Sequence, residues 1–153
     1  MDDFERLFAA HGRDVLAYAL RRTDRSSAEE VVAEVFAIAW RRRDRIPTVE
    51  PVLWLYAVAR RVLANERRAS KRREALVVAL RPVPDSGEPG PLLEALARLR
   101  PDDREVLMLT AWEGLTGAQA AAVLGCSEGA VHTRLHRARA RLAAEMSALE
   151  CAS

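Results

Sequence analysis

Apolar residues recur at helical spacing along almost the whole chain. Between residues 26 and 40, the segment SSAEEVVAEVFAIAW places Val31, Val35 and Ile38 along one side of a helix, and Val32 and Phe36 widen that apolar face. The opening residues and the C-terminal half repeat this spacing, whereas the alternation typical of strands is nearly absent. The pattern therefore predicts an all-α protein.

Residues that start, interrupt or stop helices divide this pattern into segments. Gly12 predicts a break or bend in the first helix, because glycine is a poor helix former. The second helix is expected to end before Pro47, and Pro51 suits the first turn of the third. In the C-terminal half, Pro101 is expected to divide residues 92–115 into two helices.

The start of the second helix carries a capping signal. Ser26 with Glu29, or Ser27 with Glu30, has the spacing of a capping box, in which a hydroxyl and a carboxylate satisfy the first free backbone N–H groups. We therefore expect one of these serines to be the N-cap.

The composition shifts in the middle of the chain. Residues 81–91, RPVPDSGEPGP, contain four prolines and two glycines, which is typical of a linker. We therefore predict two small helical domains, at residues 1–76 and 92–153, joined by a flexible linker over residues 77–91.

Composition and charge narrow the class of protein. The formal net charge of the 153 residues is only +2, but arginines gather in runs that can bind a polyanion. The opening MDDFERLF is acidic where a signal peptide is basic, and no apolar run has membrane-spanning length, so a cytoplasmic protein is expected. Cys126 and Cys151 fit neither a disulfide framework nor a zinc pattern, and we interpret them as reduced thiols; a redox role for the pair is the alternative.

The sequence offers no set of residues for catalysis. His11, His132 and His136 are scattered, and no nucleophile with a base and an orienting partner, or glycine-rich phosphate loop, accompanies them. His132 and His136 have the spacing of metal ligands but lack a third ligand nearby. We therefore predict no enzymatic activity, no metal and no cofactor.

Residues 115–142, LTGAQAAAVLGCSEGAVHTRLHRARARL, contain the most specific pattern in the chain. Gly125 can adopt the left-handed conformation that ends a helix, and Ser127 can cap the helix that follows. Two helices joined by a three-residue turn form a helix-turn-helix, the arrangement that places its second helix in a DNA major groove.

The second helix of this motif is expected to have one buried and one polar face. Val131 and Leu135 would pack on the first helix, against Ala121 and Leu124. The residues predicted to meet base edges and phosphates are Ser127, Glu128, His132, Thr133, Arg134, His136 and Arg137, and Arg139 and Arg141 would extend the positive surface. The alternative interpretation is a solvated basic face on an ordinary amphipathic helix.

The quoted segments resemble a known family. Residues 95–142, from ALARL to RARARL, are similar to the promoter-binding region 4 of bacterial RNA polymerase sigma factors, with the extracytoplasmic-function group as the best fit. AEEVVAEVFAIAW and VLWLYAVARRVLANERR resemble region 2 of the same family. The resemblance covers nearly the whole chain in the family's domain order, without region 3, which this group lacks.

The resemblance implies a surface for core RNA polymerase. In the family, the second helix of region 2 binds a basic coiled coil of the β′ subunit, which assigns that role to Glu30 and Glu34 here. Ala33 stands where the family often has glutamine, which removes one polar contact. The alternative is that the two acids only support the helix N-terminus.

The resemblance also implies a site for the −10 element. The family reads this element as single-stranded DNA, with one base extruded into a loop that corresponds to residues 43–51. The implied pocket residues are Arg45, Ile46, Pro47 and Thr48, and those along the strand are Arg60, Arg61, Asn65 and Arg68. Many members have asparagine in place of Arg61. Trp54 and Tyr56 are candidates for base stacking, but for Trp54 we favour a place in the core.

Taken together, the resemblance implies a sigma factor. Its partners would be the β′ and β subunits of core RNA polymerase, promoter DNA with −35 and −10 elements, and an anti-sigma factor. A stand-alone helix-turn-helix regulator is the alternative, but it leaves residues 1–76 without a role.

Overall fold

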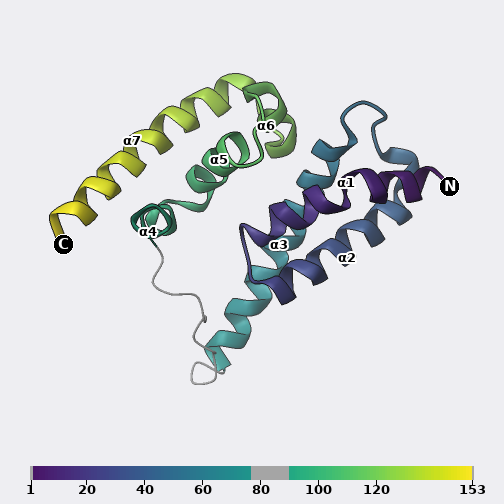
Figure 1. Ribbon diagram of the computed structural model, residues 1–153, viewed down its shortest axis with the longest axis horizontal. Helices are drawn as coiled ribbons and strands as arrows, with labels where there is room; N and C mark the ends of the chain where they lie inside the picture. The colour runs from purple at the N-terminus through teal and green to yellow at the C-terminus, as the bar shows by residue number, and fades with distance from the viewer. Residues whose placement is uncertain (1, 77–89, 153) are drawn as a thin grey trace. The chain divides into compact units, whose positions relative to one another are not determined.

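The computed structural model describes residues 2–76 and 90–152, with side chains up to residue 69 in the first range. The chain forms two compact units, Met1–Arg81 and Pro82–Ser153, which we describe separately (Figure 1). The described residues form seven α-helices and one short 3-10 helix, and no strand occurs among them. The all-α, two-domain fold is therefore confirmed. Most of the predicted linker, residues 77–89, lies outside the described residues.

Three helices build the N-terminal unit. They are α1 (Asp3–Leu20), α2 (Arg25–Arg41) and α3 (Pro51–Leu76), with the 3-10 helix η1 (Arg43–Arg45) after α2. Each helix packs on the other two, so their apolar faces share one core (Figure 1). As predicted, α2 ends before Pro47, and α3 begins at Pro51.

The core of this unit includes one of the two aromatic residues considered for base stacking. Val15, Tyr18, Val35 and Leu55 are fully buried. Tyr56 is also buried, and its ring stacks on Tyr18 with centroids 5.1 Å apart. Tyr56 is therefore a core residue, while Trp54 is half-buried on the same helix.

Two sequence predictions about this unit are wrong. Helix α1 runs through Gly12 without a break, because the cost of one helical glycine is small beside the packing of α1 on α2 and α3. The N-cap of α2 is Asp24, which precedes both predicted serines, Ser26 and Ser27: its Oδ1 accepts a hydrogen bond from Ser27 N at 2.8 Å. Since Thr23 N still donates to Ala19 O, the turn after α1 ends at this aspartate, which is as good a cap as serine.

Four helices build the C-terminal unit. They are α4 (Pro91–Arg98), α5 (Pro101–Ala111), α6 (Gly117–Leu124) and α7 (Glu128–Ala152). The long helix α7 packs against all three shorter ones (Figure 1). Pro101 occupies the first turn of α5, so the predicted division of residues 92–115 is confirmed.

Candidate nucleic-acid interface

The turn between α6 and α7 has the predicted geometry. Gly125 ends α6 with φ 69° and ψ 36°, and its N–H donates to Ala121 O at 2.8 Å. Ser127 Oγ accepts a hydrogen bond from Ala130 N at 3.1 Å, which caps α7. Both predicted caps are confirmed, and α6 and α7 form a helix-turn-helix.

The start of α6 is held by a capping box that the sequence analysis missed. Gln119 N donates to Thr116 Oγ1 at 3.2 Å, and Thr116 N donates to Gln119 Oε1 at 2.9 Å. The signal was present, since Thr-x-x-Gln before an apolar run is the pattern of this motif. The box fixes the first turn of α6, where Gly117 follows Thr116.

Packing sets the rotation of α7. Val131 and Ala138 are fully inaccessible, and Leu135 is 9% exposed. Ala121 of α6 is buried as well, whereas Arg137 is exposed and Arg134 half-buried. The predicted division of α7 into a buried apolar face and an accessible polar face is therefore confirmed.

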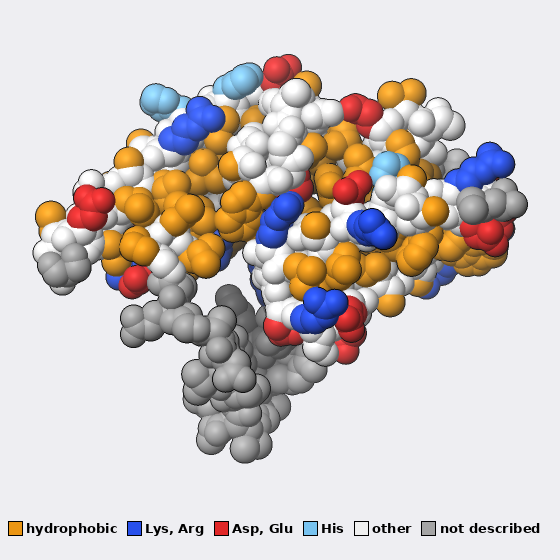
Figure 2. Space-filling model, viewed as in Figure 1, with side chains coloured by type: hydrophobic (Ala, Val, Ile, Leu, Met, Phe, Trp, Pro, Cys, Tyr) orange, Lys and Arg blue, Asp and Glu red, His pale blue; other side chains and the backbone are white. Residues whose placement is uncertain are grey.

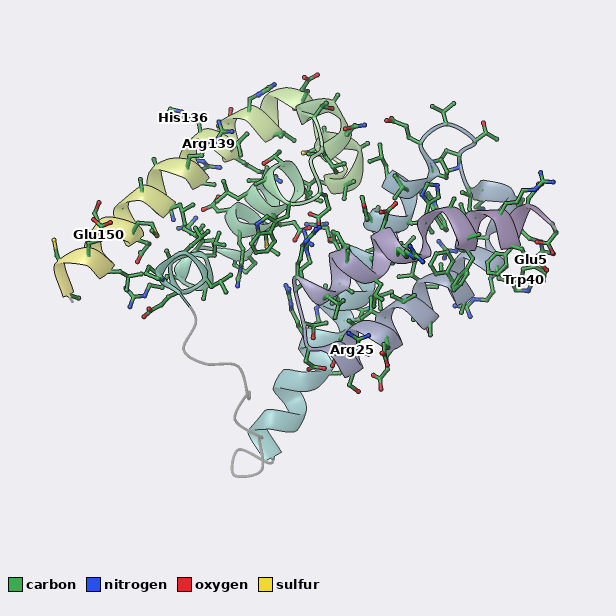
Figure 3. The ribbon with its side chains drawn as sticks, in the orientation of Figure 1. Glu5, Arg25, Trp40, His136, Arg139 and Glu150 are labelled. Atoms are coloured by element: carbon green, nitrogen blue, oxygen red, sulfur yellow. The ribbon has the colours of Figure 1, made fainter. Side chains whose placement is uncertain are left out.

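The candidate residues for duplex DNA share the first turns of α7. All of them are exposed except Arg134, which is half-buried: they are Ser127, Glu128, His132, Thr133, Arg134, His136 and Arg137. Figure 2 shows histidine and basic side chains along this helix, and in Figure 3 His136 projects from it. Thr133 Oγ1 donates to Gly129 O at 3.1 Å, and His132 Nε2 lies 3.5 Å from Glu128 Oε1.

Two ion pairs attach the rest of α7 to the other helices. Arg141 Nε lies 3.9 Å from Oδ2 of the buried Asp103 in the first turn of α5, and Arg98 of α4 lies 3.5 Å from Glu145. Arg141 therefore has a partner within its own unit, whereas Arg139 is exposed (Figure 3). Both arginines were predicted to extend the positive surface, but Arg141 forms an ion pair within its own unit.

The candidate pocket for an extruded base lies in the loop between α2 and α3. The pocket residues are Arg45, Ile46, Pro47 and Thr48; Ile46 is half-buried and the others are exposed. Glu50, just before α3, has φ 49°, an unusual value for a residue other than glycine. The loop therefore offers polar and apolar atoms at the surface, close to the start of α3.

The candidate residues on α3 lie further along the helix. Arg61, Asn65 and Arg68 are exposed and spaced so that they share one face, whereas Arg60 is half-buried. From Pro51 to Arg61 the helix rises about 15 Å. The loop and the basic face thus belong to one unit but lie at different heights along α3.

Glu30 and Glu34 are both exposed on α2, one turn apart. Glu34 Oε1 lies 3.6 Å from Arg41 Nη2, a contact that the sequence analysis did not predict. Among the described residues, Glu30 has no such partner. The two acids therefore differ, since one already faces a cation of its own chain.

An aromatic cluster beside the loop was also missed. Trp40 is 47% exposed, its ring lies edge-on to Phe4 at 5.2 Å, and the Arg43 guanidinium lies 4.2 Å from its ring centroid. Arg43 Nη1 also donates to Trp40 O at 2.7 Å. Figure 3 marks Trp40 near the end of α2. A tryptophan followed three residues later by arginine at a helix end was the available signal.

Neither a metal site nor a membrane span was found in the described part of the chain. No group of three or more histidine, cysteine, aspartate or glutamate side chains lies close enough there to hold a metal ion. No helix among those residues is both long and apolar enough to cross a bilayer.

Each unit matches a family model. Residues 7–73 match the model described as Sigma-70 region 2, and residues 90–142 match Sigma-70, region 4. The two matches follow each other in the chain as the two compact units do.

Curated relatives carry the same family name over shorter stretches. The RNA polymerase sigma-E factor of Streptomyces antibioticus is 44% identical over 55 residues, which cover 36% of this chain and 31% of the relative. The RNA polymerase sigma factor CnrH of Cupriavidus metallidurans is 42% identical over 73 residues, 40% of this chain and 38% of the relative. The matches thus span only about a third of the length of these relatives.

Solved structures match over nearly the full chain. CnrH, solved in complex with the cytosolic domain of CnrY, is 31% identical with a TM-score of 0.70, covering 95% of this chain and 88% of that one. The sigma factor RpoE of Bartonella quintana, solved with the anti-sigma factor NepR, has a TM-score of 0.74 at 24% identity, covering 96% and 98%. The second likeness concerns the fold alone.

Proposed function

The chain belongs to the extracytoplasmic-function group of the sigma-70 family, and we propose that it joins core RNA polymerase and directs transcription initiation at specific promoters. The observation that carries this proposal is the orientation of α7 in the region 4 unit. Its apolar residues, such as Val131, are buried, and its polar face is accessible to DNA.

In this proposal the C-terminal unit recognises the −35 element as duplex DNA. The exposed candidate residues of α7 occupy its first turns, the part of a recognition helix that contacts base edges. Arg137 and Arg139 add cations for phosphates, so the affinity is expected to fall steeply with salt.

The N-terminal unit is proposed to open and hold the −10 element. Exposed atoms of the loop at Arg45, Pro47 and Thr48 would contact an extruded base, with Ile46 at its side, while Arg61 and Arg68 of α3 would neutralise the strand. Extrusion costs a few kcal/mol, which these contacts offset.

Core polymerase is proposed to bind α2 of the same unit through its β′ subunit, while the β subunit would contact the rest of the sigma factor. Glu30 and Glu34 are exposed one turn apart, a spacing suited to arginine partners. Binding would exchange the Glu34–Arg41 contact, 3.6 Å long, for contacts with the polymerase.

An anti-sigma factor is the further partner that we propose. The solved sigma factors RpoE and CnrH were captured with NepR and with the cytosolic domain of CnrY, respectively. We infer that the present protein acts in the cytoplasm, where core polymerase is found, and that it catalyses no reaction itself.

Run-off transcription with purified core polymerase on a promoter library tests the proposal. We expect transcripts from a subset of promoters that share −35 and −10 sequences, and none with core polymerase alone. A stand-alone regulator would instead bind duplex DNA without co-purifying with core polymerase and without yielding transcripts. That outcome would contradict the proposal.

A further inference from the structure

The side chains of Glu128 and His132 meet above the first turn of α6. Glu128 is the first residue of α7, and its Oε1 lies 3.5 Å from Nε2 of His132, one turn further on. Both side chains remain accessible, at 58% and 65% exposure, so they are free to meet a ligand in front of the helix-turn-helix.

Gly117 of α6 makes room for this pair. A methyl group at Gly117 would lie 3.2 Å from His132 Cε1, 3.3 Å from its Nε2 and 3.5 Å from Glu128 Oε1. The backbone does not require glycine there, because its φ lies outside the left-handed region that Gly114 and Gly125 occupy. Glycine here leaves room for the imidazole to lie against α6, since a methyl group would push it back by a few tenths of an ångström.

A carboxylate in the first turn of α7 suits the positive end of the helix, but here it also lies on a surface that is proposed to bind a polyanion. Glu128 would be repelled by phosphates unless it accepts hydrogen bonds from a base or is held by a cation. In the major groove, glutamate pairs with the N4 amino group of cytosine, whereas glutamine pairs with the N6 and N7 atoms of adenine. His132 Nε2, 3.5 Å from Glu128 Oε1, lies where it can orient the carboxylate.

We propose that Glu128 reads a cytosine in the −35 element, with His132 as its positioning residue and Gly117 as the residue that lets the imidazole lie against α6. The inference rests on the proposed function, since it names the base that one residue of the −35 site recognises. In this proposal Glu128 contributes to sequence specificity, whereas contacts between the arginines of α7 and phosphates contribute affinity without sequence information.

The test is selection from duplexes randomised over the −35 element, with the full-length protein bound to core polymerase. The wild-type holoenzyme is expected to enrich cytosine at one position by about tenfold over the other bases. Glu128→Gln should shift that position toward adenine, because an amide both donates and accepts. His132→Ala should lower the cytosine preference several-fold. Gly117→Ala, which displaces the imidazole by only a few tenths of an ångström, should lower it less and leave the other positions unchanged.

A matched control is Gly90→Ala, the same substitution in the same unit at a site where an added methyl meets nothing within 4 Å. It should leave the whole profile as in the wild type. Melting curves would show that Gly117→Ala folds, since alanine is a better helix former than glycine. Glu128→Gln, an exposed change, tests the inference without altering α6.

The outcomes separate this inference from the proposed function. A preference that changes from cytosine in the wild type to adenine in Glu128→Gln supports the inference. A wild-type preference that survives in Glu128→Gln, His132→Ala and Gly117→Ala overturns the inference alone. A wild-type holoenzyme that enriches no sequence overturns the proposed −35 recognition and this inference together.

Discussion

The two units place their candidate residues on different kinds of structure. In the C-terminal unit, all the −35 candidates fall on the cap and first turns of α7. In the N-terminal unit, the −10 and core-binding candidates are divided among α2, an irregular loop and α3. A single helix with buried Val131, Leu135 and Ala138 has one possible rotation, so its outward residues follow from periodicity. A loop carries no such constraint.

The units also share a feature, since each has an exposed glutamate beside a basic side chain. Glu34 lies 3.6 Å from Arg41, and Glu128 lies 3.5 Å from His132. Arginine stays charged at all physiological pH values, whereas histidine is charged only when protonated. Glu34 therefore has a permanent cation beside it, whereas the neighbour of Glu128 carries a charge only when its imidazole is protonated.

The largest expected effect tests whether the two units are separate in stability as well as in packing. Leu55 and Leu109 are both fully buried, one in each unit. Leu55→Ala and Leu109→Ala should each destabilise their own unit by about 2–5 kcal/mol, from lost burial and the cavity left behind. Unfolding in urea, monitored through hydrogen exchange of the amides in α2 and α5, should show the loss of stability in one unit only. Equal loss in both units for either variant would mean a shared core.

The fold was largely predictable from the sequence, because its determinants are local. Apolar spacing gave the helices, Pro51 and Pro101 marked helix starts, and Gly125 and Ser127 marked the turn. The cap of α2 was missed because aspartate and serine are similarly preferred N-caps, and the length of the turn after α1 decides between Asp24 and the serines at 26 and 27.

The candidate site was less predictable, because several of its contacts join residues whose pairing depends on side-chain direction. The Glu34–Arg41 contact spans two helical turns, and the Glu128–His132 pair lies against Gly117 of another helix. In each pair, the residue types alone do not show that the two side chains are in contact. The sequence therefore predicted which residues of α7 face outward, but it did not predict the contacts that their side chains make.

Glu34→Lys is expected to weaken core binding while sparing DNA. The change replaces a hydrogen-bond acceptor by a cation that also repels Arg41, so the loss should be about 2 kcal/mol, roughly that of one hydrogen bond to a charged group. The measurement is the dissociation constant of the variant protein for core polymerase. The affinity of the same full-length variant for the −35 duplex is measured in parallel. Arg41→Ala is the control, since it removes the Glu34 contact without adding charge and should leave core binding equal or tighter. Weaker core binding in Arg41→Ala would assign the role to the arginine.

Arg137→Ala, in the C-terminal unit, is expected to weaken duplex binding while sparing core binding. The exposed arginine of α7 should contribute about 1–2 kcal/mol to duplex binding, and the slope of log affinity against log salt should fall by about one. Titrations of the −35 duplex at several salt concentrations measure both quantities. Arg13→Ala removes the same charge from an exposed position of α1 and should change neither quantity. If Glu34→Lys and Arg137→Ala impair the same step equally, the division of roles between the units is wrong.

The smallest effect compares two helix caps, one in each unit. Asp24 caps α2 through Ser27 N, and Thr116 caps α6 through Gln119 N, so replacing either by alanine should cost about 1 kcal/mol at neutral pH. Only the aspartate titrates: the hydrogen bond from the Ser27 backbone N–H, helped by the Ser27 hydroxyl and opposed by burial, lowers the pKa of Asp24 below its usual value.

Because the folded state favours the ionised carboxylate, the contribution of Asp24 is complete above its unfolded pKa and is lost as the pH falls through the lower, folded pKa. The penalty of Asp24→Ala should therefore shrink below about pH 4, whereas that of Thr116→Ala should stay constant. Denaturant unfolding of each variant between neutral and acidic pH measures this difference, and Asp24→Asn, which caps without a charge, should show the flat profile of the threonine variant. A penalty of Asp24→Ala that does not change with pH would mean that the carboxylate caps α2 no better when ionised than when protonated.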